Sequence, residues 1–213
     1  DFSILKPTTT AADILAGCRS AKKHGFKLLM VQPRHAELAI REMAGSGVLV
    51  GIVLGFPHGA DLTETKAFTA AKLSALGADE LDMVMDLGAF KAGDYAAVVR
   101  DIEAVVKAAN GAIVKVILET SELSKEEIVT ACRLVKQANA HFVKTSTGFS
   151  AKGADAADIK LMRDTVGPSM GVKASGGIRT LDQALAMLDA GASRIGVSAG
   201  ETLLAEWDAR FGK

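Results

Sequence analysis

Short apolar runs recur along the chain at nearly even intervals, and each is followed by a turn and an amphipathic stretch. The mean interval between the starts of neighbouring runs is about 27 residues, so eight such units account for essentially all 213 residues. The runs cover 2–5, 27–31, 48–54, 80–85, 112–118, 141–145, 170–174 and 194–197. This spacing predicts a chain in which strands alternate with helices.

Several of these runs are apolar almost without interruption, which is typical of strands buried on both faces of a parallel sheet. The run 48–54 reads Val-Leu-Val-Gly-Ile-Val-Leu. Capping boxes, which mark the starts of helices, are expected at 124–127, 180–183 and 61–64, and Pro33 suits a first helical position. Strands that alternate with helices predict a parallel sheet with right-handed crossovers.

Two architectures satisfy this alternation, an open doubly wound sheet and a closed (β/α)8 TIM barrel. The open sheet predicts a glycine fingerprint directly after the first strand, whereas the sequence Gly-Ser-Gly at 45–47 precedes a strand. The count of eight favours the barrel, although about 250 residues is typical of that fold. We therefore expect a single α/β domain, a TIM barrel that spans residues 1–213.

Composition excludes several classes of partner. The 25 Lys and Arg residues balance 25 Asp and Glu residues, so electrostatics favour neither nucleic acid nor a membrane surface as a partner. No apolar run reaches the length of a membrane span. Cys18 and Cys132 lie far apart without a Cys-x-x-Cys motif, which argues against both disulfides and a zinc site, so a cytoplasmic location is expected.

Four charged residues interrupt otherwise apolar strands: Asp82, Lys115, Lys144 and Lys173. Burying a lone charge costs several kcal/mol, and strands rarely carry one without a reason. A single lysine of this kind can extend to the rim or form a structural ion pair. Three lysines and one aspartate at matching depth in four consecutive strands favour a functional cluster at the end of the barrel where active sites form.

This cluster suits covalent catalysis by an amine. A lysine with its ordinary pKa of about 10.4 is protonated at neutral pH and cannot attack a carbonyl group. Burial and a second ammonium group nearby both lower the pKa and leave a nucleophilic amine. The expected intermediate is a Schiff base, with Asp82 moving protons. No metal and no cofactor is expected, because the four histidines lack the spacing of ligands.

Glycine-rich turns follow the seventh and eighth runs. They read Ala-Ser-Gly-Gly-Ile-Arg-Thr at 174–180 and Gly-Val-Ser-Ala-Gly at 196–200. Each turn leads into the start of a helix, where backbone amides are expected to be exposed to a phosphate group. Together they predict a phosphate site, although each glycine pair alone also fits a tight turn.

Five segments, 1–7, 77–84, 115–120, 142–149 and 172–180, resemble the deoxyribose-phosphate aldolase family in the same order. The most specific are Lys-Thr-Ser-Thr-Gly at 144–148 and Lys-Ala-Ser-Gly-Gly at 173–177. The resemblance implies a class I aldolase that reversibly cleaves 2-deoxy-D-ribose 5-phosphate to glyceraldehyde 3-phosphate and acetaldehyde. It implies that Lys144 forms the Schiff base, that Lys173 lowers its pKa and relays protons, and that Asp82 is the acid/base acting through a water molecule.

The resemblance also implies a set of substrate-binding residues. Asp1, Lys115 and Thr147 match positions that line the pocket, and Gly148, Gly176, Gly177, Gly196 and Ser198 match the phosphate-binding turns. Two departures from the family's pattern bear on substrate range. Ala199 stands in place of a serine, and Asp86 in place of an asparagine, where we expect its carboxylate on the same strand face as Asp82.

Alternative functions stay open from the sequence. One is a related Schiff-base aldolase or a transaldolase with a different or unphosphorylated acceptor. Another is a non-catalytic barrel that binds a sugar phosphate. A homodimer is an expectation that comes from the resemblance alone.

Overall fold

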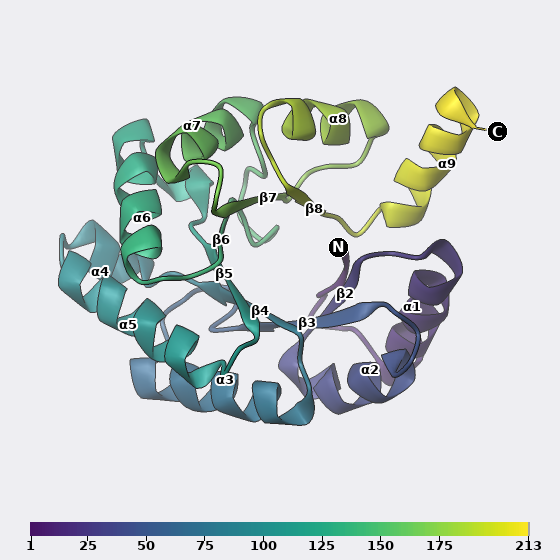
Figure 1. Cartoon of the computed structure of the whole chain (residues 1–213), viewed down its shortest axis with the longest axis horizontal. Coiled ribbons are helices and arrows are strands. Elements are labelled where there is room, and N and C mark those ends of the chain that lie inside the picture. The colour runs from purple at the N-terminus through teal and green to yellow at the C-terminus, as the bar shows by residue number, and fades with distance from the viewer. Residues whose placement is uncertain (213) are drawn as a thin grey trace.

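The computed structural model describes residues 1–212, and its eight parallel strands curl into a barrel in the order in which they occur in the chain (Figure 1). The strands are β1 (Phe2–Ile4), β2 (Leu28–Val31), β3 (Leu49–Leu54), β4 (Glu80–Val84), β5 (Ile113–Ile117), β6 (Phe142–Lys144), β7 (Gly171–Ser175) and β8 (Arg194–Gly196). The barrel closes where Phe2 pairs with Val197, just after β8, and the Ser3 amide donates to the Val197 carbonyl at 2.8 Å. The predicted TIM barrel is confirmed, with one strand in each predicted run.

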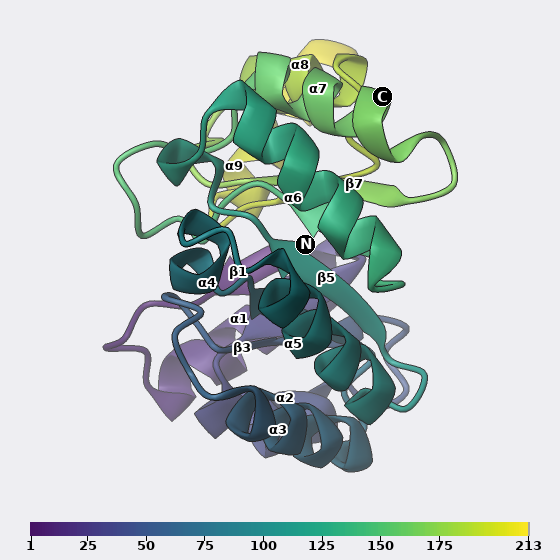
Figure 2. The ribbon, with the colours of Figure 1, turned by 90° about the vertical axis from the view of Figure 1, so that its left-hand side faces the viewer.

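The helices cover the outside of the sheet, as two perpendicular views show (Figures 1 and 2). They are α1 (Ala11–His24), α2 (Ala36–Met43), α3 (Thr63–Leu76), α4 (Leu87–Lys91), α5 (Tyr95–Ala108), α6 (Lys125–Gln137), α7 (Ala156–Val166), α8 (Leu181–Asp189) and α9 (Gly200–Phe211), with short 3-10 turns η1 (Pro33–His35) and η2 (Thr120–Glu122). Within residues 1–212, no helix combines the length and apolar character that crossing a membrane requires.

Two of the three expected capping boxes are present. Ser124 caps α6 and Thr180 caps α8, each with the reciprocal side-chain bond. The third, at the start of α3, was wrong: Leu62 is the N-cap, and the Thr63 hydroxyl instead donates to Asp101 on α5 at 2.8 Å. Asp101 also accepts from Lys66, so a buried polar cluster joins α3 to α5.

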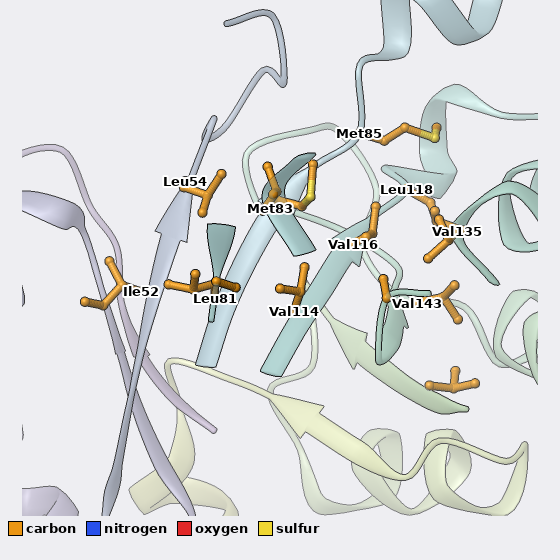
Figure 3. Close-up of a cluster of buried hydrophobic side chains, with 14 of the residues drawn as sticks. Ile52, Leu54, Leu81, Met83, Met85, Val114, Val116, Leu118, Val135 and Val143 are labelled. Carbon is orange, nitrogen blue, oxygen red and sulfur yellow. The ribbon is translucent and has the colours of Figure 1, made fainter. Parts of the chain in front are cut away.

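The main apolar core lies between the strands and the helices. Figure 3 shows a part of it, in which Leu81, Met83, Val114 and Val116 from β4 and β5 lie side by side. Because successive side chains of a strand point to opposite faces, the residues between them, among them Asp82 and Lys115, point into the barrel. The alternation that buries the outer face therefore brings the charged side chains together inside.

The interior of the barrel has an apolar half, formed by Leu28, Met30 and Val53. Gly51 leaves room for these side chains, because a Cβ atom at this position would lie 2.5 Å from Cε of Met30. The large side chains of β2 therefore fill one side of the barrel. The other side, from β4 to β8, is left for polar groups.

Candidate active site

Asp82 lies at the centre of the predicted charged cluster. Its carboxylate is fully buried and accepts from three lysines: Lys115 donates to Oδ1 at 2.7 Å, and Lys144 and Lys173 donate to Oδ2 at 2.8 and 2.9 Å. Four neighbouring strands, β4 to β7, supply these four groups. Since the two lysines of β6 and β7 share one oxygen atom, their nitrogen atoms lie on the same side of the barrel wall, as the sequence analysis expected.

Three further charged residues complete the cluster: Asp1, which was predicted, and Glu80 and Arg194, which sequence reasoning missed. Glu80 of β4 forms an ion pair with Lys115, and Arg194 of β8 contacts Glu80 at 3.3 Å and Asp1 at 2.7 Å. Asp1 also contacts Lys173 at 2.5 Å. The alternation of side chains along a strand could have identified Glu80, because it precedes Asp82 by two positions and so lies on the same strand face.

The side-chain charges of this cluster do not balance when every side chain is ionised. It contains three carboxylates, Asp1, Glu80 and Asp82, and four cations, Lys115, Lys144, Lys173 and Arg194. Each of the other cations contacts at least two of the carboxylates, whereas Lys144 contacts Asp82 alone. Lys144 is therefore the cation whose deprotonation restores neutrality at the smallest loss of ion pairing.

The pKa values follow this arrangement. Burial lowers the pKa of Lys144 to about 7; the Asp82 carboxylate opposes this shift, and the ammonium group of Lys173 reinforces it. Burial likewise lowers the pKa of Lys173 to about 8, against the effect of Asp82. Burial alone would raise the pKa of Asp82, but the three lysines hold it well below its usual range. At neutral pH the cluster thus combines an ionised carboxylate with an amine that is substantially uncharged.

A cavity of about 740 Å³ opens above the cluster, at the carboxyl ends of the strands. Its wall includes Lys144 and the predicted residues Thr147, Gly148, Gly176, Gly177, Gly196 and Ser198. Four other predicted residues, Asp1, Asp82, Lys115 and Lys173, do not reach the wall and are buried beneath it. Of the three lysines of the cluster, only Lys144 is placed to meet a molecule in the cavity.

Gly196 serves the cluster as well as the cavity. A Cβ atom at this position would lie 2.8 Å from Cε and 3.6 Å from Nζ of Lys173. The absence of a side chain in β8 therefore leaves the space through which Lys173 reaches Asp82.

The two predicted helix starts differ in the amides that they offer. At α8, the Arg179 and Thr180 amides donate to the side chain of Gln183, and the Leu181 amide donates to Glu206 of α9 at 2.6 Å. The first amides of α8 are therefore occupied, and the predicted phosphate contact of this turn depends on Gly176 and Gly177, which line the cavity. At α9, the N-cap is Ala199, which makes no side-chain bond. The amides of α9 are thus left for another acceptor.

Two other residues differ from expectation. Asp86 lies beyond the end of β4 and caps α4, where it accepts from the Ala89 amide at 2.9 Å, so its carboxylate does not extend the strand face of Asp82. Glu119, which sequence reasoning missed, is buried after β5 and accepts hydrogen bonds from Thr147.

Among residues 1–212, no group of three or more His, Cys, Asp or Glu side chains is arranged to hold a metal ion.

The structure is a parallel (β/α)8 barrel in which a lysine of lowered pKa lies at the base of a cavity, above buried ionised groups. These features define an enzyme of the barrel class that is equipped for covalent carbonyl chemistry. Residues 2–206 match the family model described as DeoC/LacD family aldolase. The chain belongs to this family.

Named relatives and solved structures agree with this assignment. Deoxyribose-phosphate aldolase of Clostridium novyi is 53% identical over 199 residues, which cover 93% of this chain and 90% of that protein. The enzyme of the same name from Thermococcus gammatolerans is 53% identical over 204 residues, 94% of this chain and 91% of that protein. The tetrameric deoxyribose phosphate aldolase structure from Aeropyrum pernix superposes with a TM-score of 0.92 at 33% identity, covering 99% of this chain and 89% of that one.

Proposed function

We propose that the protein is a class I aldolase that reversibly cleaves 2-deoxy-D-ribose 5-phosphate to glyceraldehyde 3-phosphate and acetaldehyde. The observation that carries the proposal is the position of Lys144, whose amine lines the cavity and has a pKa of about 7. Relatives about half identical over nearly the whole chain, named as enzymes of this reaction, support the choice of substrate.

The first step is attack of the Lys144 amine on the aldehyde carbon of the open-chain sugar. A carbinolamine forms, and loss of water gives an iminium ion. The oxygen that leaves must gain a proton, and Lys173, with its pKa of about 8, is the better donor because the pKa of Asp82 is far lower. We assign two roles to Asp82. It is a base that exchanges protons with the substrate through a water molecule, and its carboxylate accepts the hydrogen bonds that orient both amines.

The second step breaks the bond between C2 and C3. The C3 hydroxyl group loses its proton to a base, a carbonyl group forms at C3, and the electron pair of the broken bond enters the iminium to give an enamine on Lys144. Glyceraldehyde 3-phosphate leaves. Protonation of C2 and hydrolysis of the resulting iminium then release acetaldehyde and restore the amine.

The phosphate group is assigned to the opposite end of the cavity. The uncapped start of α9 offers backbone amides there, and Ser198, Gly148, Gly176 and Gly177 line the wall beside it. The exposed cations Lys6 and Arg179, which line the same cavity, add favourable charge. Asp1 and Lys115 are assigned an indirect part in substrate binding, since they hold Lys173 and Asp82 in place.

The test is the release of acetaldehyde from 2-deoxyribose 5-phosphate, followed with alcohol dehydrogenase and NADH. We expect turnover by the wild type and none by Lys144→Met, which keeps the length of the buried side chain but lacks the amine. Binding of the sugar phosphate without release of acetaldehyde would contradict the proposal and favour a binding protein. Faster turnover of unphosphorylated deoxyribose or of a longer ketose would favour a related aldolase or a transaldolase.

Other properties remain predictions. They are the single catalytic domain over residues 1–213, the cytoplasmic location and the homodimer. The Aeropyrum pernix relative is described as a tetramer, so size-exclusion chromatography with light scattering is the direct measurement of the assembly of this chain.

A further inference from the structure

The start of α9 rests on two stacked aromatic rings. Phe2 of β1 and Phe26, in the turn between α1 and β2, have their ring centroids 5.0 Å apart and their planes 25° apart. Both side chains are half-buried and pack against the main apolar core. Gly200, the first residue of α9, lies directly against these rings, which we call the aromatic pair.

Gly200 leaves no room for a side chain. A Cβ atom at this position would lie 2.8 Å from Cζ and 3.0 Å from Cε1 of Phe26, and 3.3 Å from Cδ2 of Phe2. Of the residues Gly200–Phe211, which form α9, Gly200 is the one that is buried. The backbone of the first turn therefore touches both rings, and the rings determine how closely this turn approaches the barrel.

The residues just before Gly200 form the wall of the cavity at the end assigned to the phosphate group. Val197 and Ser198 line the cavity, and the N-cap that follows them makes no side-chain bond to the first amides of α9. Val197 pairs with Phe2, so α9 begins beside the first strand (Figure 1). Strand pairing thus fixes this segment at Val197, and the aromatic pair fixes it at Gly200.

Backbone amides bind an anion well only at a narrow range of distances and angles, because hydrogen bonds weaken steeply outside that range. We propose that Phe2 and Phe26 are positioning residues for phosphate recognition, which hold Gly200 so that the amides of α9 reach the phosphate group of the substrate. The aromatic pair then determines the preference for a phosphorylated over an unphosphorylated sugar and has no part in the chemistry at Lys144. This inference rests on the proposed aldolase function.

The experiment measures kcat/KM for cleavage of 2-deoxyribose 5-phosphate and of 2-deoxyribose, and the ratio of the two is the phosphate preference. Gly200→Ala forces the first turn of α9 away from Phe26, and Phe26→Leu removes Cζ and Cε1 and leaves a gap beneath the turn. The loss of one hydrogen bond to a charged group corresponds to about tenfold or more in affinity. Each variant should lower the phosphate preference by at least this factor, through KM for the phosphorylated sugar, while kcat/KM for 2-deoxyribose stays at the wild-type value.

The double variant Phe26→Leu/Gly200→Ala is a sharper test. Its new methyl group occupies the space of the lost ring atoms, so the double variant should regain most of the wild-type preference although each change alone lowers it. Phe68→Leu, at an exposed phenylalanine of α3, is the matched control and should keep the wild-type preference. Inorganic phosphate probes the same site without the sugar, and its inhibition constant should rise in both single variants and recover in the double variant.

Three results would overturn the inference while leaving the aldolase function intact. The first is a phosphate preference in both single variants equal to that of the wild type. The second is an equal loss of activity toward both sugars, which is what a structural role of the rings produces. The third is a loss in the double variant equal to the product of the two single losses, because the two positions would then act independently.

Failure to fold and failure of the proposed function give separate results. If Gly200→Ala does not fold, as judged by circular dichroism, Phe26→Leu decides the question by the first two criteria, since it only removes atoms. If the wild-type protein cleaves neither sugar, the proposed function itself fails and the inference fails with it.

Discussion

Replacing Lys173 by methionine removes the second ammonium group beneath Lys144 while keeping most of the side-chain volume. Both nitrogen atoms lie within 2.9 Å of the same Asp82 oxygen. Two unit charges about 5 Å apart interact by about 3 kcal/mol at an effective dielectric constant of about 20. This energy corresponds to about 2 units of pKa. Without Lys173, Asp82 and Asp1 also keep more of their negative charge for Lys144, which acts in the same direction.

The reactive form of Lys144 is the uncharged amine, so imine formation rises as pH increases through its pKa, which is about 7 in the wild type. In Lys173→Met we expect the midpoint of this rise near pH 9, which lowers the uncharged fraction of Lys144 at pH 7 about 50-fold. The assay is the initial rate of borohydride-trapped acetaldehyde adduct at a series of pH values. Loss of the Lys173 proton donor slows this rate as well, so the midpoint of the pH profile, and not the rate at one pH, reports the pKa of Lys144. Lys107→Met, at an exposed position of α5, is the control. A midpoint unchanged from the wild type would refute the electrostatic reasoning.

Two further substitutions test the packing around the site. Gly196→Ala places a methyl group 2.8 Å from Cε of Lys173. We expect kcat/KM for deoxyribose phosphate to fall at least about tenfold while the protein still folds. Wild-type activity of this variant would show that Lys173 does not need this space. Lys66→Met leaves Asp101 buried without its cation, and urea denaturation should show a loss of about 3–5 kcal/mol in the free energy of unfolding, most of it regained in Lys66→Met/Asp101→Leu. A loss below 1 kcal/mol would contradict this role of the ion pair.

The barrel and its central charged residues were predictable because both depend on local patterns. Each strand is a run of apolar residues of the right length, and a charged residue within such a run must point either to the outer core or into the barrel. Asp82, Lys115, Lys144 and Lys173 all interrupt apolar runs and were recognised for that reason.

The residues that sequence reasoning missed or misplaced depend on contacts between distant segments. Glu80 and Arg194 are the first residues of their strands. A charged residue at this position is also common as the last residue of the preceding loop, so neither stood out as a charge within an apolar run. Glu119 is buried by Thr147, which is 28 positions away in the sequence. The amide at the start of α8 is occupied by Glu206, a residue of the following helix. No local pattern contains these pairings.

Asp86 shows how a strand face can be misread near the end of a strand. The alternation that places Asp82 inside the barrel holds only while the backbone stays extended in the sheet, and β4 ends at Val84. The chain then turns into α4, and a carboxylate at the start of a helix is stabilised by its free amides. Asp86 therefore caps α4, although the strand pattern had placed its side chain in the barrel interior.

The most direct measurement is borohydride reduction in the presence of acetaldehyde at pH 7, followed by peptide mass mapping of the whole chain. We predict one ethyl group per chain, on Lys144, with Lys115 and Lys173 unmodified. An ethyl group on Lys173 in place of Lys144, or no adduct in protein that still releases acetaldehyde from deoxyribose phosphate, would contradict it.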